Sequence, residues 1–415
     1  MARMESQRIA VLGAGPIGLE AALYAAALQL PCTVFERGRV GENLQRWGHV
    51  RLFSPFGMNS TPLGRARIHA DQPQHTLPDA NAILTGRDHV TAYLEPLALS
   101  PALISSIREN TAVLRVGRRG FLKEDYPGDI RRAKEPFRLL LRDDKGKESI
   151  EEADVVLDCT GVYGHPRWLG EGGVPAIGEI AARSHIAHGL EDVAGERKAV
   201  YADKTTLVIG SGYSAATTVC NLAALADKHP ATWVIWLARA PGTQPIRRIT
   251  NDSLRERDHI AVRANTLATR SDGNVEFHPQ TVVEAIETAG PDRGFKVSGH
   301  SGGKAVSWDV ERVIANVGYT PDTDLYRELQ IHECYATLGP MGLAAALLKH
   351  GGGDCLTIPS QGPAALRNPE PNFYILGAKS YGRNSNFLLR TGFEQIRDVF
   401  TLIMGKLHLD LYKTR

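Results

Sequence analysis

Two glycine-rich loops, each set between an apolar strand and an apolar helix, place the strongest limit on how this chain can fold. They lie in residues 11–21, VLGAGPIGLEA, and residues 208–218, VIGSGYSAATT. In a strand–turn–helix unit, the first two glycines allow a tight turn and a close approach of backbone to a pyrophosphate, and the third lets helix and strand pack closely. The free N–H groups at the start of the helix favour the anion. The predicted binding residues are Gly13, Gly15, Pro16 and Gly18 in the first loop, and Gly210, Gly212, Ser214 and Ala215 in the second.

The strands that follow the two loops end on residues of opposite charge. The first strand ends on Glu36, 23 residues after the first glycine, which is about the spacing of an acid that binds a ribose diol. Arg37 comes next and is a further candidate contact. The second strand ends on Arg239, and an arginine there favours a 2′-phosphate that an acid would repel. Arg247 and Arg248 are alternatives on the following loop, and the competing interpretation is that Arg239 is a solvated strand end.

The same organisation occurs twice along the chain. Residues 137–161 and residues 295–318 each indicate strand, turn, strand and a final apolar strand, which ends in CTG or NVG. A passage rich in glycine, proline and histidine follows the first of these and marks a domain crossing. We therefore predict an α/β fold with two Rossmann-like dinucleotide-binding domains. The second, residues 166–318, is expected to be inserted into a discontinuous first domain, residues 1–165 and 319–415.

Composition argues against several classes of protein. The formal net charge of +2 gives no strong field for nucleic acid or an anionic membrane. The five cysteines are scattered without a CxxC pair, which argues against a disulfide framework, a structural zinc site and a CxxC redox centre. The histidines show no metal-ligand spacing, so no metal is expected. Glycines and prolines interrupt the apolar residues near the N-terminus, so we predict no signal peptide or membrane span and expect a cytoplasmic protein.

These motifs, in this order, resemble those of the two-dinucleotide-binding-domain flavoprotein superfamily, which includes flavin-containing monooxygenases and pyridine nucleotide–disulfide reductases. The resemblance implies FAD on the first loop and NADPH on the second. It matches Gly161 to the strand end where the chain leaves the FAD domain. At the C-terminal strand the superfamily commonly has Gly-Asp, whose acid contacts FAD, whereas this chain has Gly377, Ala378 and Lys379. Asn386 precedes the last helix, whose N-terminus would point at the flavin and stabilise its reduced anion.

The stretch RWGHVRLFSPFGMNST, residues 46–61, is the candidate lining of the reaction site. Trp47 is expected to wall the flavin, and His49 and Arg51 to supply hydrogen bonds. The stretch resembles the part of class B monooxygenases that carries an asparagine near the flavin, which implies such a role for Asn59. The competing interpretation is that the aromatic residues belong to the core and that His49 is a satisfied histidine. The class B fingerprint before the second glycine loop is not found.

Two bound dinucleotides imply hydride transfer from a nicotinamide to a flavin. Because the redox cysteine pair of disulfide reductases is absent, the resemblance favours an NADPH-dependent monooxygenase that uses dioxygen, through a flavin peroxide, on a small nitrogen, sulfur or carbonyl compound. One alternative is an NAD(P)H-dependent reductase that passes electrons to a quinone, a metal centre or a partner protein. Another is a non-catalytic redox sensor. The expected partners are a small substrate and dioxygen, without nucleic acid or membrane, and a homodimer is an open alternative.

Overall fold

The chain folds into two compact units. The computed structural model describes residues 7–288, 290, 293–349, 354–358 and 360–413. Unit 1 contains Met1–Gly48, Ser54–His165 and Thr320–Arg415, and unit 2 contains His49–Phe53 and Pro166–Tyr319. Residues 49–53, which we expected in the first domain, cluster with unit 2.

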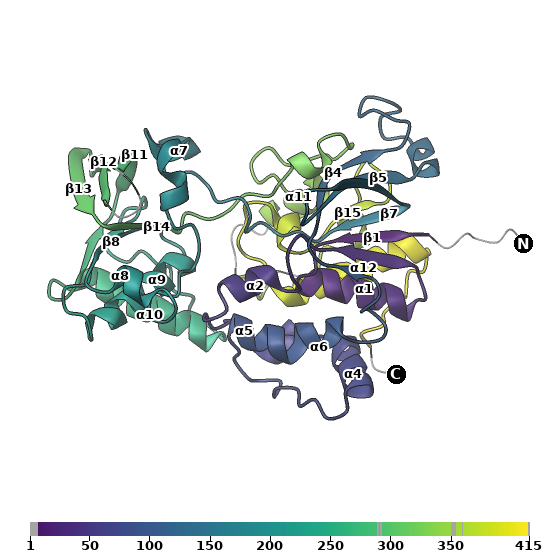
Figure 1. The fold of residues 1–415 in the computed structure, drawn as a ribbon, viewed down its shortest axis with the longest axis horizontal. Coiled ribbons are helices and arrows are strands. Elements are labelled where there is room, and N and C mark those ends of the chain that lie inside the picture. Colours follow the sequence, from purple (N-terminus) through teal and green to yellow (C-terminus); the bar gives the residue numbers. More distant parts are fainter. Residues whose placement is uncertain (1–6, 289, 291–292, 350–353, 359, 414–415) are drawn as a thin grey trace, which may run out of the picture. The chain divides into compact units, whose positions relative to one another are not determined.

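A five-stranded parallel sheet forms the centre of unit 1, in the order β15-β7-β1-β2-β3 (Figure 1). Its strands are β1 (Ile9–Leu12), β2 (Cys32–Phe35), β3 (Ile107–Arg108), β7 (Val155–Asp158) and β15 (Phe373–Ile375). β1 pairs with β2 on one side and with β7 on the other, so Leu12 lies beside both Phe35 and Asp158. The carboxyl ends of these strands meet at one edge, which is where open parallel sheets bind their ligands.

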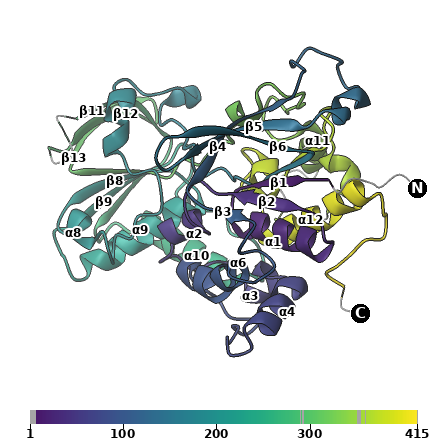
Figure 2. The same cartoon turned by 45° about the vertical axis from the view of Figure 1, so that its right-hand side comes forward.

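Alternate residues of β1 face two different layers. Val11 packs among the residues of α1 (Pro16–Ala27) and α12 (Leu389–Met404), whereas Leu12 packs against a three-stranded antiparallel sheet. That second sheet consists of β4 (Thr111–Arg118), β5 (Phe137–Asp143) and β6 (Glu148–Ala153) (Figure 2). Because both faces are covered, β1 and β7 are buried along their whole length, as is usual in parallel sheets.

Short helices fill the chain between β2 and β3. They are α2 (Glu42–Arg46), α3 (Phe56–Asn59), α4 (Pro62–Asp71), α5 (Gly86–His89) and α6 (Glu95–Ala98), and α11 (Met341–Lys349) lies nearer the C-terminus. Thr85 caps α5 through a capping box: its hydroxyl accepts from the Asp88 N–H at 3.1 Å, and the Asp88 carboxylate accepts from the Thr85 N–H at 3.1 Å. A π-helical turn over Val90–Leu94 joins α5 to α6.

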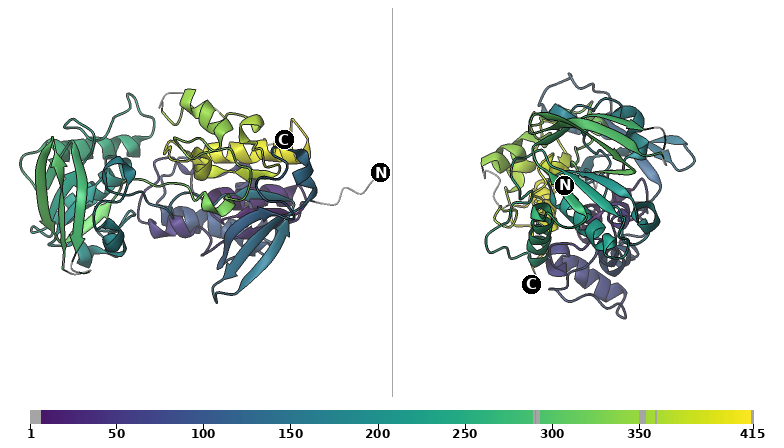
Figure 3. Two further views of the ribbon diagram at one scale, coloured as in Figure 1. Left: turned by 90° about the horizontal axis from the view of Figure 1, so that it is seen from above. Right: turned by 90° about the vertical axis from the view of Figure 1, so that its left-hand side faces the viewer.

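Unit 2 repeats the central arrangement of unit 1 around a four-stranded parallel sheet, in the order β10-β9-β8-β14. Its strands are β8 (Thr205–Ile209), β9 (Trp233–Leu237), β10 (Val275–His278) and β14 (Arg312–Ala315). The helices are α7 (Glu179–Ala182), α8 (Lys198–Tyr201), α9 (Tyr213–Ala226) and α10 (Arg255–Thr269). One face of the sheet packs on α9 and α10, and the other on an antiparallel sheet of β11 (Thr281–Thr288), β12 (Phe295–Ser301) and β13 (Lys304–Val310), the green layer of Figure 3.

The strand order confirms the predicted α/β class. In both units a glycine loop joins a central strand to a helix, and that strand is flanked by the next strand and by a later, returning strand. None of the helices within the described residues has the length and apolar character that crossing a membrane requires.

Candidate functional site

The first glycine loop joins β1 to α1 and leaves one open side. Gly13 has a φ of +96°, and a Cβ there would lie 3.0 Å from the Cys159 carbonyl oxygen. A Cβ on Gly18 would overlap the Gly13 carbonyl oxygen, so only glycine allows α1 to approach β1 this closely. A Cβ on Gly15 would meet nothing within 4 Å. The open space beside Gly15 therefore lies at the N-terminus of α1, where Pro16 is the first helical residue and a phosphate would find free N–H groups.

The carboxylate of Glu36, at the end of β2, holds the same loop. Its Oε2 accepts from the Ala14 N–H at 2.7 Å, and its Oε1 accepts from the Gly38 N–H at 2.9 Å. Arg37 is exposed, and a Cβ on Gly164 would lie 3.2 Å from its Nη2, so Arg37 lies against the segment that follows β7. The two residues thus line the edge where a dinucleotide ribose is expected.

A buried ion pair joins the ends of β7 and β15. The Lys379 Nζ lies 2.6 Å from the Asp158 Oδ2, and neither side chain is exposed. The Asp158 Oδ1 accepts from the Thr160 N–H at 3.1 Å and from its hydroxyl at 2.7 Å. The Lys379 ammonium donates to the Thr160 hydroxyl oxygen at 3.0 Å. This network holds the turn at Gly161. It was not predicted from the sequence, where Lys379 is distinctive only as a departure from Gly-Asp.

The turn after β15 is also held from α12. Gly377 has a φ of +69°, and its N–H donates to the Gln395 Oε1 at 2.8 Å. The Gln395 Nε2 donates to the Ser380 Oγ at 2.9 Å, and the Ser380 hydroxyl donates to the Gly377 carbonyl at 2.7 Å. Both backbone groups of Gly377 are therefore engaged within the protein. Asn386, before α12, donates its N–H to the Asn384 Oδ1 at 3.0 Å.

The predicted reaction residues are divided between the units. Trp47 follows α2 in unit 1, and its indole Nε1 is buried without a hydrogen-bond partner among the described residues. Asn59 is buried in unit 1 and uses its amide locally: Oδ1 accepts from the Ser54 hydroxyl at 2.7 Å, and Nδ2 donates to the Ser54 carbonyl at 2.8 Å. His49, half-buried, and Arg51, exposed, belong to unit 2. The four residues do not gather within one unit.

The second glycine loop, between β8 and α9, is open on the same side as the first loop, but Ala215 replaces its third glycine. Gly210 has a φ of +140°, and a Cβ there would overlap the Asn316 carbonyl oxygen. A Cβ on Gly212 would meet nothing within 4 Å. Ser214 is half-buried in the first turn of α9, and Ala215, in the place of the third glycine, is fully buried. The opening again lies at a helix N-terminus, which suits a phosphate.

The three candidate arginines of unit 2 differ in their engagement. β9 ends at Leu237, Ala238 follows it, and Arg239 comes next and is exposed, as is Arg247. Arg248 makes a two-pronged pair with Asp258, with both N–O distances 2.9 Å. Because Arg248 is already held by a carboxylate, Arg239 and Arg247 are the better candidates for a 2′-phosphate.

All five cysteines are free thiols. Burial raises the pKa of Cys32 to about 12 and that of Cys220 to about 11, and it raises the pKa of Cys159 well above its usual value. A hydrogen bond from the Thr337 side chain lowers the pKa of Cys334. Cys159, the cysteine beside the first loop, is therefore poorly suited to form the thiolate that thiol–disulfide exchange requires. Within the described residues there is no group of three or more potential metal ligands.

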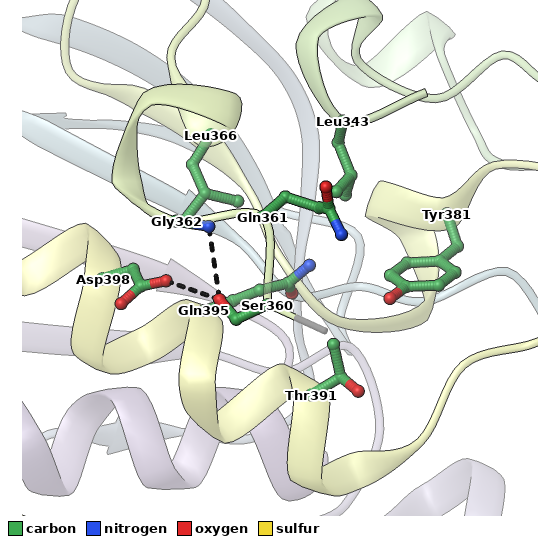
Figure 4. Close-up of a pocket in the computed structure, with 9 residues that line it drawn as sticks. All are labelled: Leu343, Ser360, Gln361, Gly362, Leu366, Tyr381, Thr391, Gln395 and Asp398. Atoms are coloured by element: carbon green, nitrogen blue, oxygen red, sulfur yellow. Dashed lines mark hydrogen bonds between the residues drawn. The ribbon is translucent and has the colours of Figure 1, made fainter. Parts of the chain in front are cut away.

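A small, open pocket lies against the polar side chains of α12 (Figure 4). The Ser360 hydroxyl donates to the Asp398 Oδ2 across it at 2.9 Å, and Asp398 also pairs with Arg397 at 2.7 Å. The pocket adjoins the turn after β15 through Gln395. No local sequence pattern predicts this pocket, because its wall comes from four separate segments: Leu343, Ser360, Gln361, Gly362, Leu366, Tyr381, Thr391, Gln395 and Asp398.

Comparison with known proteins finds likeness in structure but not in sequence. No family model matches the sequence, and no curated protein sequence matches it. The bacillithiol disulfide reductase from Bacillus cereus is 17% identical, with a TM-score of 0.70 over 96% of this chain and 99% of that chain. The cadaverine monooxygenase from Erwinia amylovora, solved with FAD, is 14% identical, with a TM-score of 0.66 over 98% and 96% of the chains. The ornithine hydroxylase from Pseudomonas aeruginosa is 16% identical, with a TM-score of 0.62 over 96% and 99%.

These matches extend over nearly the whole of each chain, so both units and their connection are shared. The strand–loop–helix unit that occurs twice here is the feature from which a dinucleotide-binding domain is recognised. The chain has the fold of the two-dinucleotide-binding-domain flavoproteins.

Proposed function

We propose that the protein is an FAD-dependent oxidoreductase that receives hydride from NADPH, with FAD on the first glycine loop and NADPH on the second. The observation that carries the proposal is the difference between two otherwise similar loops. The first is followed by the buried acid Glu36, which suits a ribose diol. The second is followed by the exposed Arg239, which suits a 2′-phosphate.

Three features of unit 1 fit FAD. The space beside Gly15 at the start of α1 suits the pyrophosphate, and Glu36 lies next to it. The Trp47 indole is a buried donor without a partner among the described residues, as expected of a group that a ligand satisfies. Bound FAD would supply the electron-accepting ring, while the chain supplies position and electrostatics.

For the final electron acceptor we favour dioxygen, in a monooxygenase that acts on a small nitrogen, sulfur or carbonyl compound. A relay through a pair of thiols is disfavoured, because the five cysteines are free and burial raises the pKa of Cys159, beside the first loop. The cadaverine monooxygenase and the ornithine hydroxylase are similar in fold to this chain.

The second candidate is a reductase that passes electrons to a quinone, a metal centre or a partner protein. The likeness in fold to bacillithiol disulfide reductase supports this candidate. In either enzyme, we propose that Asn59 acts by holding Ser54 and its loop, and that His49 and Arg51 donate hydrogen bonds to the substrate.

Anaerobic reduction followed by oxygen tests the proposal and separates the candidates. The purified full chain should bind FAD, and NADPH should bleach the flavin absorbance faster than NADH. On mixing with oxygen, a monooxygenase should give a transient band at about 370–390 nm before the oxidised spectrum returns, whereas a reductase should return to that spectrum directly. A chain that fails to bind FAD, or bound flavin that NADPH leaves oxidised, would refute the proposal.

Two further proposals concern the setting of the enzyme. We propose a cytoplasmic location, which fractionation of cells that express the chain would test. A homodimer is the assembly to test by light scattering after size-exclusion chromatography. A mass of one chain at micromolar concentration would exclude a stable dimer.

A further inference from the structure

We propose that Lys379 is a positioning residue for the FAD phosphates, because its ammonium neutralises Asp158 directly beneath the first glycine loop. Asp158 can then hold the Thr160 turn without placing a net negative charge under the loop. This inference rests on the proposal that the first loop binds FAD.

The ion pair lies close to the loop through two backbone contacts. The Cys159 N–H, which follows Asp158, donates to the Leu12 carbonyl at 2.9 Å, at the point where β1 enters the loop. A Cβ on Gly13 would lie 3.0 Å from the Cys159 carbonyl oxygen and 3.3 Å from the Thr160 Cα. The segment that Asp158 organises therefore forms the floor against which the first glycine packs.

Neither member of the pair reaches water. Both side chains are fully buried, with the Lys379 Nζ 2.6 Å from the Asp158 Oδ2. The ammonium also lies 5.1 Å from the centre of the Tyr326 ring, which favours a cation. Charges in such an interior are weakly screened by solvent and salt. If one charge were removed, the other would act on a phosphate at the loop with little attenuation.

The pair also accounts for the missing acid after β15. The side chain of Ala378 has no polar group to offer a flavin, and the next side chain, Lys379, turns into the sheet edge instead. The turn is thereby held from two sides, by Lys379 on the β7 side and by Gln395 on the α12 side. A backbone held in this way can be presented to a cofactor without a side-chain carboxylate.

The experiment is a titration of the deflavinated full chain with FAD, followed by quenching of flavin fluorescence. Lys379→Met leaves a buried carboxylate that repels the phosphates, and the FAD dissociation constant should rise about tenfold. Asp158→Asn leaves a buried cation, and FAD should bind no more weakly than to the wild type. The double variant carries neither charge, and its dissociation constant should lie within about threefold of the wild type. This sign pattern and this rescue would not result from a purely structural role.

Arg132→Met is the matched control. Arg132 is also a fully buried cation, paired with Glu370 at 2.8 Å and bonded to the carbonyls of Leu122 and Asp125. Its replacement should lower the stability of the fold, while the FAD affinity of the folded protein stays within about twofold of the wild type.

Each outcome decides the proposal. Equal losses of affinity in Lys379→Met and Asp158→Asn, or a double variant as weak as Lys379→Met, would overturn it in favour of simple packing. If Lys379→Met does not fold, tighter binding by the double variant than by Asp158→Asn would overturn it. Failure of the wild-type chain to bind FAD would refute the proposed function as well, and is therefore distinguishable from these results.

Discussion

Glu20 of α1 should make the stability of unit 1 depend on pH in an unusual direction. The side chain is fully buried. Its Oε1 accepts from the Thr61 hydroxyl at 2.7 Å, and its Oε2 accepts from the Tyr93 hydroxyl at 3.2 Å. Burial outweighs these bonds and raises the pKa of Glu20 from 4.5 to about 7. The folded chain therefore keeps this proton at a pH where the unfolded chain has lost it.

The sign and size of the effect follow from the two pKa values. Below pH 4.5 the carboxyl is protonated in both states, and the stabilisation from Glu20 is fully present. As the pH rises towards 7, the unfolded state ionises first, so the free energy of unfolding falls. The loss is complete above the folded pKa of about 7 and amounts to about 3 kcal/mol, because each pKa unit corresponds to about 1.4 kcal/mol.

Glu20→Gln removes the titration while keeping size and hydrogen-bonding capacity. Hydrogen exchange of α1 peptides in urea reports the free energy of unfolding of unit 1 alone. The advantage of the variant over the wild type should grow by about 3 kcal/mol between pH 4.5 and pH 7.5. A difference that stays constant over this range would show that Glu20 ionises normally in the folded chain, and would refute the reasoning.

His89 supplies the matched control with the opposite sign. Burial lowers the pKa of His89 from 6.5 to about 4, so its contribution to stability is present above 6.5 and is lost as the pH falls towards 4. His89→Leu should therefore gain on the wild type only on the acid side, in the same exchange measurement. A gain on the alkaline side would contradict the assignment of the buried neutral imidazole.

The remaining predictions concern the two loops. Gly18→Ala forces a Cβ into the Gly13 carbonyl oxygen, so urea unfolding should show a loss of about 2 kcal/mol or more. Gly15→Ala has room for its Cβ, so its stability should change by less than about 0.5 kcal/mol while the FAD dissociation constant rises about tenfold; unchanged affinity would refute a phosphate beside Gly15. Arg239→Ser should raise the KM for NADPH about tenfold and leave the KM for NADH unchanged. Arg248→Ser should change neither KM, because Asp258 already holds the Arg248 side chain. Equal effects on both coenzymes in Arg239→Ser would refute a 2′-phosphate contact.

The loops could be predicted from the sequence because their signals are local. A tight turn, a helix N-terminus and an acid at the end of the next strand lie within one strand–helix–strand unit, whose geometry fixes their distances. Glu36 accordingly reaches the Ala14 N–H. Local patterns do not reveal which distant side chain meets a strand end. Lys379 and Asp158 come from two different chain segments of unit 1, and the sequence near either residue does not indicate that the two side chains pair.

Residues 46–61, the candidate lining of the reaction site, also depend on contacts that local sequence patterns do not reveal. Their composition suggested a single surface, yet residues 49–53 cluster with unit 2 while Trp47 and Asn59 lie in unit 1. The amide of Asn59 is taken up by Ser54, five residues earlier, through a loop conformation that no periodicity encodes. Hydrogen bonds between a side chain and a nearby loop depend on the final packing, so composition does not predict them.

Both loops have glycine at the first position, Gly13 and Gly210, whereas the third position is Gly18 in one loop and Ala215 in the other. The surroundings of each position in the duplicated architecture account for this difference. In each unit a Cβ on the first glycine would crowd the carbonyl oxygen of the residue that follows the returning strand. This residue is Cys159 after β7 for Gly13, and Asn316 after β14 for Gly210. Gly13 and Gly210 also have a φ in the region that favours glycine. At the third position the units differ: a Cβ on Gly18 would overlap the Gly13 carbonyl oxygen, whereas Ala215 leaves 3.5 Å between its Cβ and the place a Cβ would take on Gly210. The contact between the helix and the loop therefore differs between the units, whereas in both units a positive φ and the backbone after the returning strand favour glycine at the first position.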